Sequence, residues 1–302
     1  MNDASADADV LVICGPTAAG KSDIALRVAE RTGRSILVAD SRQVYQGFDI
    51  GTAKPTTEEQ RRVRHYAIDI VPPTKRFSAA QWADVASDAL NAQPPERRPI
   101  VVGGTGLYLR ALFEGLFREP ETDVGRRMSL LDWLDGLATE ELRRWVAALD
   151  PARASLGRTQ LLRAVEVAML TGTRISELHA SEATQPRWRP RYLVVDPGLS
   201  LHGRIERRLD AMLAGGWLDE VKRLRTVPDD APAWKASGYR ALRDVVDGLV
   251  SLDETRERIL IETRQYAKRQ RTWFRHQLPE PATIRVNPEQ DDVDQVVGRW
   301  LQ

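Results

Sequence analysis

A glycine-rich segment near the amino terminus has the residue types and spacing of a phosphate-binding loop. Residues 15–22 read GPTAAGKS and match the pattern G-x-x-x-x-G-K-[ST] in full. A buried run precedes the segment and a helical pattern follows it, so its backbone N–H groups can surround an anion at the positive end of that helix. Lys21 would place a charge on the terminal phosphates, and Ser22 would offer a hydroxyl to Mg²⁺. The segment predicts a polyphosphate site but leaves open which organic group carries the phosphates.

Asp40 follows a short buried run, residues 35–39, that is typical of a strand. The carboxyl ends of parallel strands open onto the ligand crevice, so Asp40 is expected to face the phosphate loop. An aspartate in that place could deprotonate a nucleophile or help to orient metal-bound water. It could equally cap a helix or a turn, and the residues alone leave both interpretations open.

Cationic side chains line one face of a long helix expected near the carboxyl terminus. No acidic residue lies between positions 263 and 279. Such a stripe can neutralise phosphates and bind RNA without reading its sequence, although a solvated helix face is the alternative. Tyr266 and Trp273 lie on a different stripe, and we assign them to the core. The cations are Arg264, Lys268, Arg271 and Arg275, spaced i, i+4, i+7 and i+11, with Arg269 as a fifth.

Composition limits the class of protein. The chain has 302 residues, 42% hydrophobic and 29% charged, which fits one or two globular domains and excludes a disordered or collagen-like chain. The net charge of +1 alone predicts no polyanionic partner, although only six of the 44 basic residues are lysine and arginine suits phosphate contacts. Cys14 is the single cysteine, no apolar run could span a membrane, and residues 1–9 lack the charge pattern of a leader. We expect a cytoplasmic protein with no membrane association.

Hydrophobic periodicity predicts the elements that must position these residues. Short buried runs alternate with helical patterns through the first half, which is typical of a parallel sheet with helices on both faces. Strands are expected at 10–14, 35–39, 66–71, 99–102, 192–195 and 283–286. Helices are expected at 21–32, 79–92, 202–213, 218–224 and 253–276, with a closing helix after the last strand.

The middle of the chain interrupts this alternation. From about residue 115 to 189 the periodicity is helical, and no convincing strand occurs. We therefore predict an α/β fold with a P-loop NTPase-like parallel sheet flanked by helices and a helical insertion domain. The expected parts are a flexible tail (1–9), a catalytic core (10–115 and 190–302) and the insertion (116–189).

Six segments resemble the tRNA dimethylallyltransferases, and they occur in that family's order between residues 10 and about 276. Several of the matches exceed eight residues, so the resemblance is far more specific than the phosphate loop alone. The segments are GPTAAGKS, DSRQVYQGFDIGTAKP (40–55), VGGTGLYLRAL (102–112), RIERRLDAML (204–213), GYR (238–240) and TRQYAKRQRTWFR (263–275).

The resemblance implies transfer of a dimethylallyl group from dimethylallyl diphosphate to N6 of adenine 37, beside the anticodon of tRNA. It implies that Ser22 binds Mg²⁺. It also implies that Asp40 is the general base. Thr17, Lys21 and Arg204 complete the expected catalytic set, because negative charge on the departing diphosphate needs cations and N–H donors. We expect a monomer that acts on the anticodon stem-loop. The expected donor-binding residues are Gly15, Pro16, Thr17, Ala18, Ala19, Gly20, Lys21 and Ser22.

The resemblance also implies tRNA contacts. The chain departs from the family at residues 155–166, SLGRTQLLRAVE, where a His-Pro-Asn-Asp element common in the family is missing and Arg-Ala-x-Glu is retained. The expected contacts are Asp40, Ser41, Arg42, Gln43, Thr105, Arg127, Thr159, Gln160, Arg163, Lys235, Gly238, Tyr239, Arg240, Arg264, Lys268 and Arg271.

Three other functions fit parts of the sequence. A prenyltransferase acting on free adenine nucleotides would share the phosphate loop and Asp40, but it needs neither the cationic helix nor the insertion. A small-molecule kinase would need a second acidic motif on a strand, for which Asp196 is the only candidate. A non-catalytic RNA-binding protein would not need Lys21, Ser22 and Asp40 intact.

Overall fold

The computed structural model describes residues 9–115, 123–181 and 188–302, which divide into two compact units. Met1–Phe113 and Arg187–Gln302 form one unit, and Glu114–Pro186 forms the other. This division lies within a few residues of the boundaries expected for a core and an insertion. The tail expected at residues 1–9 lies outside the described residues except for Asp9, which begins the first strand.

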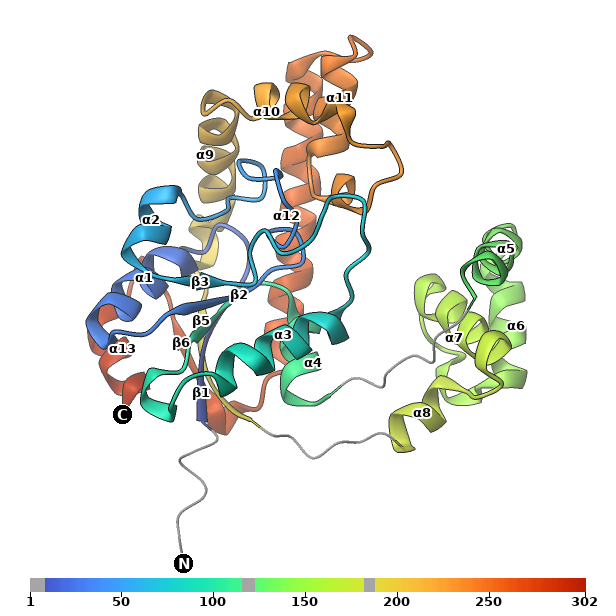
Figure 1. Ribbon diagram of the computed structural model, residues 1–302, viewed down its shortest axis with the longest axis horizontal. Helices are drawn as coiled ribbons and strands as arrows, with labels where there is room; N and C mark the ends of the chain where they lie inside the picture. Colours follow the sequence, from blue (N-terminus) through green and yellow to red (C-terminus); the bar gives the residue numbers. More distant parts are fainter. Residues whose placement is uncertain (1–8, 116–122, 182–187) are drawn as a thin grey trace, which may run out of the picture. The chain divides into compact units, whose positions relative to one another are not determined.

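A parallel sheet forms the centre of the first unit (Figure 1). In the described residues it has six strands in the order β3-β2-β4-β1-β5-β6, and each neighbouring pair is parallel. The strands are β1 (Asp9–Cys14), β2 (Ile36–Ala39), β3 (His65–Tyr66), β4 (Ile100–Gly103), β5 (Arg189–Val195) and β6 (Thr283–Val286).

The register of the sheet brings three loops together at its carboxyl edge. Cys14 of β1 and Ala39 of β2 both pair with Gly103 of β4. The phosphate loop, Asp40 and the turn after Gly103 therefore leave the sheet at one level. The strand order also reverses beside β1, and ligands of α/β folds bind at such a switch point. The predicted fold class is confirmed.

Strand side chains alternate between two hydrophobic cores. Val12 belongs to one core and its neighbour Ile13 to the other. The core around Ile13 is covered by α1 (Lys21–Thr32) and α13 (Val293–Leu301). The core around Val12 is covered by α3 (Ala79–Asn91), α4 (Gly106–Phe113), α9 (Leu201–Ala214), α10 (Trp217–Arg223), α11 (Tyr239–Val246) and α12 (Leu252–His276). None of the described helices is long and apolar enough to cross a membrane.

The third strand is shorter than the sequence predicts. β3 has two residues, whereas a strand over 66–71 was expected. Ala67 and Asp69 adopt φ angles of 62° and 54°, which turn the chain out of the sheet. Val71 returns only as an isolated bridge to Tyr45. The helices α2 (Thr57–Arg62), α4 and α11 lie in stretches for which the periodicity predicts no element.

The second unit is helical, as the sequence predicts. Its helices are α5 (Val124–Asp135), α6 (Thr139–Leu149), α7 (Arg158–Thr171) and α8 (Ile175–Ser181). Their buried side chains form a separate core that includes Leu134, Leu142, Val146, Leu161 and Val165. The insertion therefore has its own hydrophobic burial, as an independent domain does.

Trp82 anchors α3 against the sheet, so its removal tests this packing. The ring is fully buried, stacks on Tyr108 with centroids 4.7 Å apart and donates from Nε1 to the carbonyl of Val38 (2.9 Å). Trp82→Ala should lower the free energy of unfolding, measured by urea titration, by about 3–5 kcal/mol. Trp145→Ala removes a ring that is 42% exposed and should cost less than about 1 kcal/mol. Equal losses in both variants would contradict this packing.

Candidate active site

The phosphate loop joins β1 to α1 through residues 15–20. Gly20 caps α1 with a φ of 94°, in the left-handed region that glycine adopts readily. Nζ of Lys21 donates to the carbonyl of Pro16 (2.7 Å) across the loop. Strand, loop and helix thus follow one another as the motif requires, with the loop at the amino end of a 12-residue helix.

A buried glutamine of α12 ties the phosphate loop to the turn after β4. Oε1 of Gln270 accepts from the N–H of Thr17 (2.8 Å), and its Nε2 donates to the carbonyl of Gly104 (2.8 Å). Gln270 is only 7% exposed. Both hydrogen bonds of one amide therefore fix two loops that the sequence places far apart from each other and from α12.

Two arginines of α9 reach the same loop. Nε of Arg204 donates to the carbonyl of Ala18 (3.0 Å), and a guanidinium N–H of Arg208 donates to the hydroxyl of Thr17 (3.0 Å). The two arginines are four residues apart, so they share one face of α9. The structure thus brings Thr17, Lys21 and Arg204, the expected phosphate-side catalytic residues, to one place and adds Arg208 to them.

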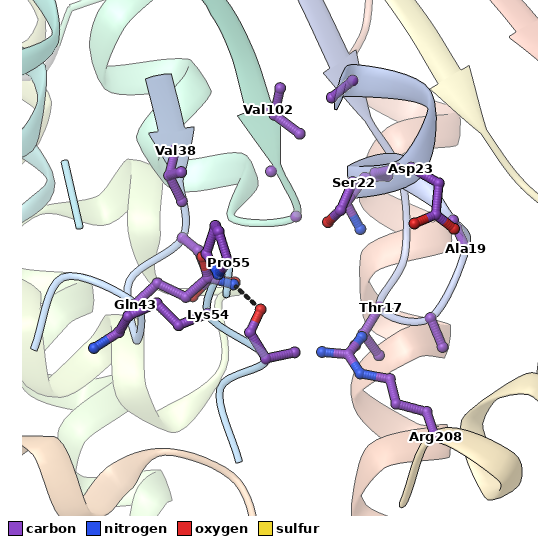
Figure 2. A pocket seen from close by; sticks show the side chains of 18 of the residues that line it. Thr17, Ala19, Ser22, Asp23, Val38, Gln43, Lys54, Pro55, Val102 and Arg208 are labelled. Carbon is purple, nitrogen blue, oxygen red and sulfur yellow. Dashed lines mark hydrogen bonds between the residues drawn. The ribbon is translucent and has the colours of Figure 1, made fainter. Parts of the chain in front are cut away.

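A cavity of about 620 Å³ opens beside the phosphate loop. Figure 2 shows Gln43, Lys54 and Pro55 on one side of it and Thr17, Ser22 and Arg208 on the other. Residues 17–22 line it, whereas Gly15 and Pro16 of the predicted set do not. Val38 and Val102 add an apolar end. The cavity can therefore hold an anion that carries a hydrocarbon group, with the charge on the cationic wall.

A second cavity of about 630 Å³ meets the first. The residues that line both are Thr17, Ala18, Asp40, Arg208 and Tyr266. The second cavity is further lined by Ser41, Arg42, Gly51, Thr52, Thr105, Trp217, Lys235 and Arg269, among others. Asp40 therefore borders two spaces, one with a phosphate-binding wall and one with a cationic rim.

Short local bonds fix the orientation of Asp40. Its Oδ1 accepts from the N–H of Arg42 (2.8 Å), a turn geometry that aspartate favours. The next residue, Ser41, donates its N–H to the hydroxyl of Thr105 (3.2 Å). The loop after β2 is thus joined to the second glycine-rich turn, and the predicted set Asp40 to Gln43 lies at the cavities with Thr105.

The electrostatics of the site follow from burial and from Asp40. Burial lowers the pKa of Lys21 to about 8, with Arg208 acting in the same direction and Asp40 opposing both. Burial also lowers the pKa of Arg208, again opposed by Asp40. Tyr266 changes in the other sense, because burial and the Asp40 charge raise its pKa to about 12. A bound polyanion would relieve the crowding of positive charge.

The cationic stripe of α12 is only partly a free face. Arg271 bonds to the carboxylate of Asp196 and to the carbonyl of Gly198, and Arg264 lies 3.8 Å from Glu206. Asp196 directly follows β5 and Glu206 lies on α9, so the absence of acids along α12 itself does not leave these cations unpaired. Arg271 joins α12 to the segment after β5, and its contact with tRNA stays a prediction. Lys268, Arg269 and Arg275 are exposed.

The structure does not support the prediction that Tyr239 contacts tRNA. Its ring is fully buried and its hydroxyl donates to Glu220 (2.6 Å), so its side chain cannot contact tRNA as expected. Gly238 is buried as well, and a Cβ there would overlap the ring of Trp217, so its role is close packing at a φ of 84°. The flanking cations, Lys235 and Arg240, are exposed and keep their prediction as RNA contacts.

In the insertion, Glu166 binds two arginines that were predicted to contact tRNA. Its carboxylate accepts from Arg127 (2.7 Å) and from Arg163 (2.6 Å), and its side chain is only 5% exposed. The glutamate of the retained Arg-Ala-x-Glu element therefore orders both arginines. Thr159 and Gln160 are exposed in the first turn of α7, so both keep their prediction as RNA contacts.

Three site residues were not predicted from the sequence. Tyr266, assigned to the core, is 38% exposed and lines both cavities. Arg208 could have been found from its spacing to Arg204. Gln270 carries a weaker indication, as a neutral amide four residues after Tyr266 within a run of arginines. The predicted Arg240, Lys268 and Arg264 do not line either cavity.

The chain is similar to known proteins over most of its length. The model of the family described as IPP transferase matches residues 43–277. A tRNA dimethylallyltransferase of Geobacter metallireducens is 43% identical over 276 residues, covering 88% of this chain and 89% of that protein. One of Alkalilimnicola ehrlichii is 39% identical over 302 residues, covering 97% and 95%. The crystal structure of the tRNA isopentenylpyrophosphate transferase of Bacillus halodurans has a TM-score of 0.68 at 31% identity, covering 98% of this chain and 95% of that one.

The lowered pKa of Lys21 predicts a pH dependence of anion binding. If only the protonated amine binds, the affinity for inorganic pyrophosphate, measured by calorimetry, should fall about tenfold between about pH 7 and about pH 9. Lys21→Met should bind about tenfold or more weakly at the lower pH, because a charge-assisted hydrogen bond is lost, and should lack this extra decline. The titration of pyrophosphate itself is common to both proteins. Parallel pH profiles for the two would contradict the assignment.

Proposed function

The chain belongs to the IPP transferase family, and on that premise we propose that it transfers the dimethylallyl group of dimethylallyl diphosphate to N6 of adenine 37 in tRNA. The chain is a transferase that acts on tRNA. We propose the identity of the donor, the acceptor atom and the residues that bind them. The observation that carries it is the position of Asp40 where a cavity lined by the phosphate loop meets a cavity with a cationic rim.

The first cavity fits the donor. Its cationic wall would hold the diphosphate on the loop amides and on Lys21, while its apolar end would hold the hydrocarbon group away from water. As the C–O bond of the allylic diphosphate breaks, its electron pair leaves with the diphosphate and negative charge grows there. Lys21, Arg204 and Arg208 line this cavity and would stabilise that charge.

Mg²⁺ is proposed to bind together with the diphosphate. No group of three or more His, Cys, Asp or Glu side chains in the described ranges could hold a metal ion alone. The hydroxyl of Ser22 lines the donor cavity, which fits Mg²⁺ because this ion uses one or two protein oxygens and completes its shell with phosphates and water. When bound, the ion would supply charge neutralisation on the diphosphate.

The second cavity fits the acceptor. An adenine must leave its stack to reach the donor, and an unpaired loop base does so at least cost. N6 is a poor nucleophile, so the carboxylate of Asp40 would accept its proton as the new N–C bond forms. Tyr266 borders the same junction, and the guanidinium of Arg269 lies over its ring, 5.9 Å from the centroid, so an aromatic ring and a cation are both near the proposed base site.

A cationic rim supports a nucleic acid as the acceptor. Arg42, Lys235 and Arg269 line the second cavity. Lys268, beside Arg269 on α12, and Arg240, five residues after Lys235, are exposed. A free nucleotide does not need this rim. We further propose that the enzyme acts as a monomer.

The kinase alternative loses its candidate motif. Asp196, the second acid that a kinase would need for Mg²⁺, is engaged by Arg271 at the end of β5. It lines neither cavity. The comparisons likewise do not favour this alternative or the free-nucleotide prenyltransferase.

Asp40→Asn tests the proposed base. The variant keeps an oxygen that can accept from the N–H of Arg42, so the local turn survives while the proton acceptor is lost. Transfer of labelled dimethylallyl to an anticodon stem-loop should fall about 10²–10⁴-fold in kcat. Affinity for inorganic pyrophosphate should not fall, because a negative charge near the site is removed.

Asp88→Asn is the matched control, since Asp88 is exposed on α3 and lines neither cavity. It should transfer at the wild-type rate. An Asp40→Asn enzyme with a wild-type kcat would contradict the role of Asp40 and leave the donor site untouched.

The rim predicts salt-dependent RNA binding. A Lys235→Ala, Arg269→Ala double variant should bind the stem-loop more weakly and reduce the slope of log affinity against log salt by about two. Arg62→Ala on α2 removes an exposed cation that is paired with Glu30 (2.8 Å), and neither residue lines a cavity, so its slope should remain that of the wild type. Fluorescence anisotropy at several salt concentrations measures both. Equal slopes in all three proteins would show that the rim does not contact phosphates.

A further inference from the structure

One loop separates the acceptor cavity from the donor cavity. Residues 49–55, here called the shared wall, follow Asp40 in the chain. Gly51 and Thr52 line the second cavity, whereas Ala53, Lys54 and Pro55 line the first. A shift of this loop would therefore change both spaces at once.

A buried pair of side chains outside both cavities holds the backbone of the shared wall. Oε2 of Glu220 accepts from the N–H groups of Asp49 (3.1 Å) and Ile50 (2.8 Å). The hydroxyl of Tyr239 accepts from the N–H of Gly51 (3.1 Å) and donates to Oε1 of Glu220 (2.6 Å). Three successive backbone N–H groups thus donate to one carboxylate–phenol pair.

The pair is buried, so its bonds do not compete with water. Glu220 is 3% exposed and Tyr239 is fully buried. Burial and the neighbouring carboxylate raise the pKa of Tyr239, which keeps its hydroxyl protonated and donating. The ring of Trp217 packs against both Gly51 and Tyr239. A buried carboxylate is costly unless it is fully hydrogen-bonded, and here the groups that satisfy it belong largely to the shared wall.

The shared wall in turn holds Gln43, a residue of the loop that follows β2. Nε2 of Gln43 donates to the carbonyls of Thr52 (3.0 Å) and Ala53 (3.2 Å). Gln43 lines the donor cavity three residues after Asp40. These two hydrogen bonds fix the orientation of the Gln43 side-chain amide, with its nitrogen toward the shared wall.

The wall is also strained, so it needs support. Ala53 has a φ of 50°, which a residue with a Cβ rarely adopts. The side chain of Lys54 is only 3% exposed and is paired with Asp49 and Asp69, and it donates to the carbonyl of Tyr45 (2.8 Å). A strained backbone conformation persists where many surrounding interactions hold it in place. Such conformations occur most often at functional sites.

We propose that Glu220 and Tyr239 are positioning residues for the transfer reaction, which hold the shared wall so that it orients Gln43 beside the reacting groups. The proposal rests on the proposed function for the identity of the reaction. It explains why a phenol and a carboxylate that touch neither cavity are joined to the loop between them. Their contribution is to the geometry of transfer, and they take no part in binding the diphosphate.

Tyr239→Phe is the test, because it removes one hydroxyl and keeps the ring. Loss of about one hydrogen bond should raise amide hydrogen exchange at residues 49–51 about tenfold. The kcat for transfer to the stem-loop should fall about tenfold, with KM for the stem-loop and affinity for pyrophosphate unchanged within about twofold. Glu220→Gln keeps an acceptor oxygen for the backbone amides and should fall between Tyr239→Phe and the wild type in both measurements.

Tyr66→Phe is the matched control, since it removes a hydroxyl from β3, outside both cavities. It should leave exchange of the wall and kcat as in the wild type. Faster exchange with a wild-type kcat would overturn the proposal, and so would an unchanged exchange rate. A parallel fall in pyrophosphate affinity would also overturn it, because that result indicates general loosening. If the wild-type protein transfers no label, the proposed function fails, and exchange alone then decides whether the pair holds the wall.

Discussion

The two hydrogen bonds of Gln270 are the interaction on which the site depends. A phosphate loop and a glycine turn leave buried backbone groups without partners, and such groups must be satisfied. One amide of α12 satisfies an N–H of the first loop and a carbonyl of the second, at 2.8 Å each. This bond pair sets the height and rotation of a 25-residue helix against the sheet. Tyr266, one turn earlier, is thereby placed at the junction of the cavities, and Arg269 is placed at the rim.

Charge is distributed around that junction in a way that suits a group transfer between an anion and a base. Lys21, Arg204 and Arg208 gather on the side of the phosphate loop, where negative charge would develop. Asp40 is the acid at the meeting point and faces the acceptor side as well. In the proposed reaction each group acts on a different bond: Asp40 would accept the proton of the acceptor amine, and the cations would stabilise the diphosphate that leaves.

Local patterns predicted the sheet, the phosphate loop and the place of Asp40, because strand burial and loop spacing are encoded within a few residues. The roles of other residues depend on partners far along the chain. The acid that pairs with Arg271, Asp196, follows β5, and the partner of the Tyr239 hydroxyl, Glu220, lies on α10. Tyr266 looked like a core residue because periodicity cannot tell a core from a cavity wall. The strand over 66–71 failed at positive φ angles, which hydrophobicity does not encode.

The most direct test of the account is transfer of labelled dimethylallyl from its diphosphate, with Mg²⁺, to three acceptors. These are an anticodon stem-loop with adenine at position 37, the same stem-loop with guanine at that position, and free AMP. We predict label in the first acceptor alone, because only that acceptor offers an adenine amine on an RNA that fits the cationic rim. Label in AMP at a comparable rate, or in the guanine stem-loop, would contradict it.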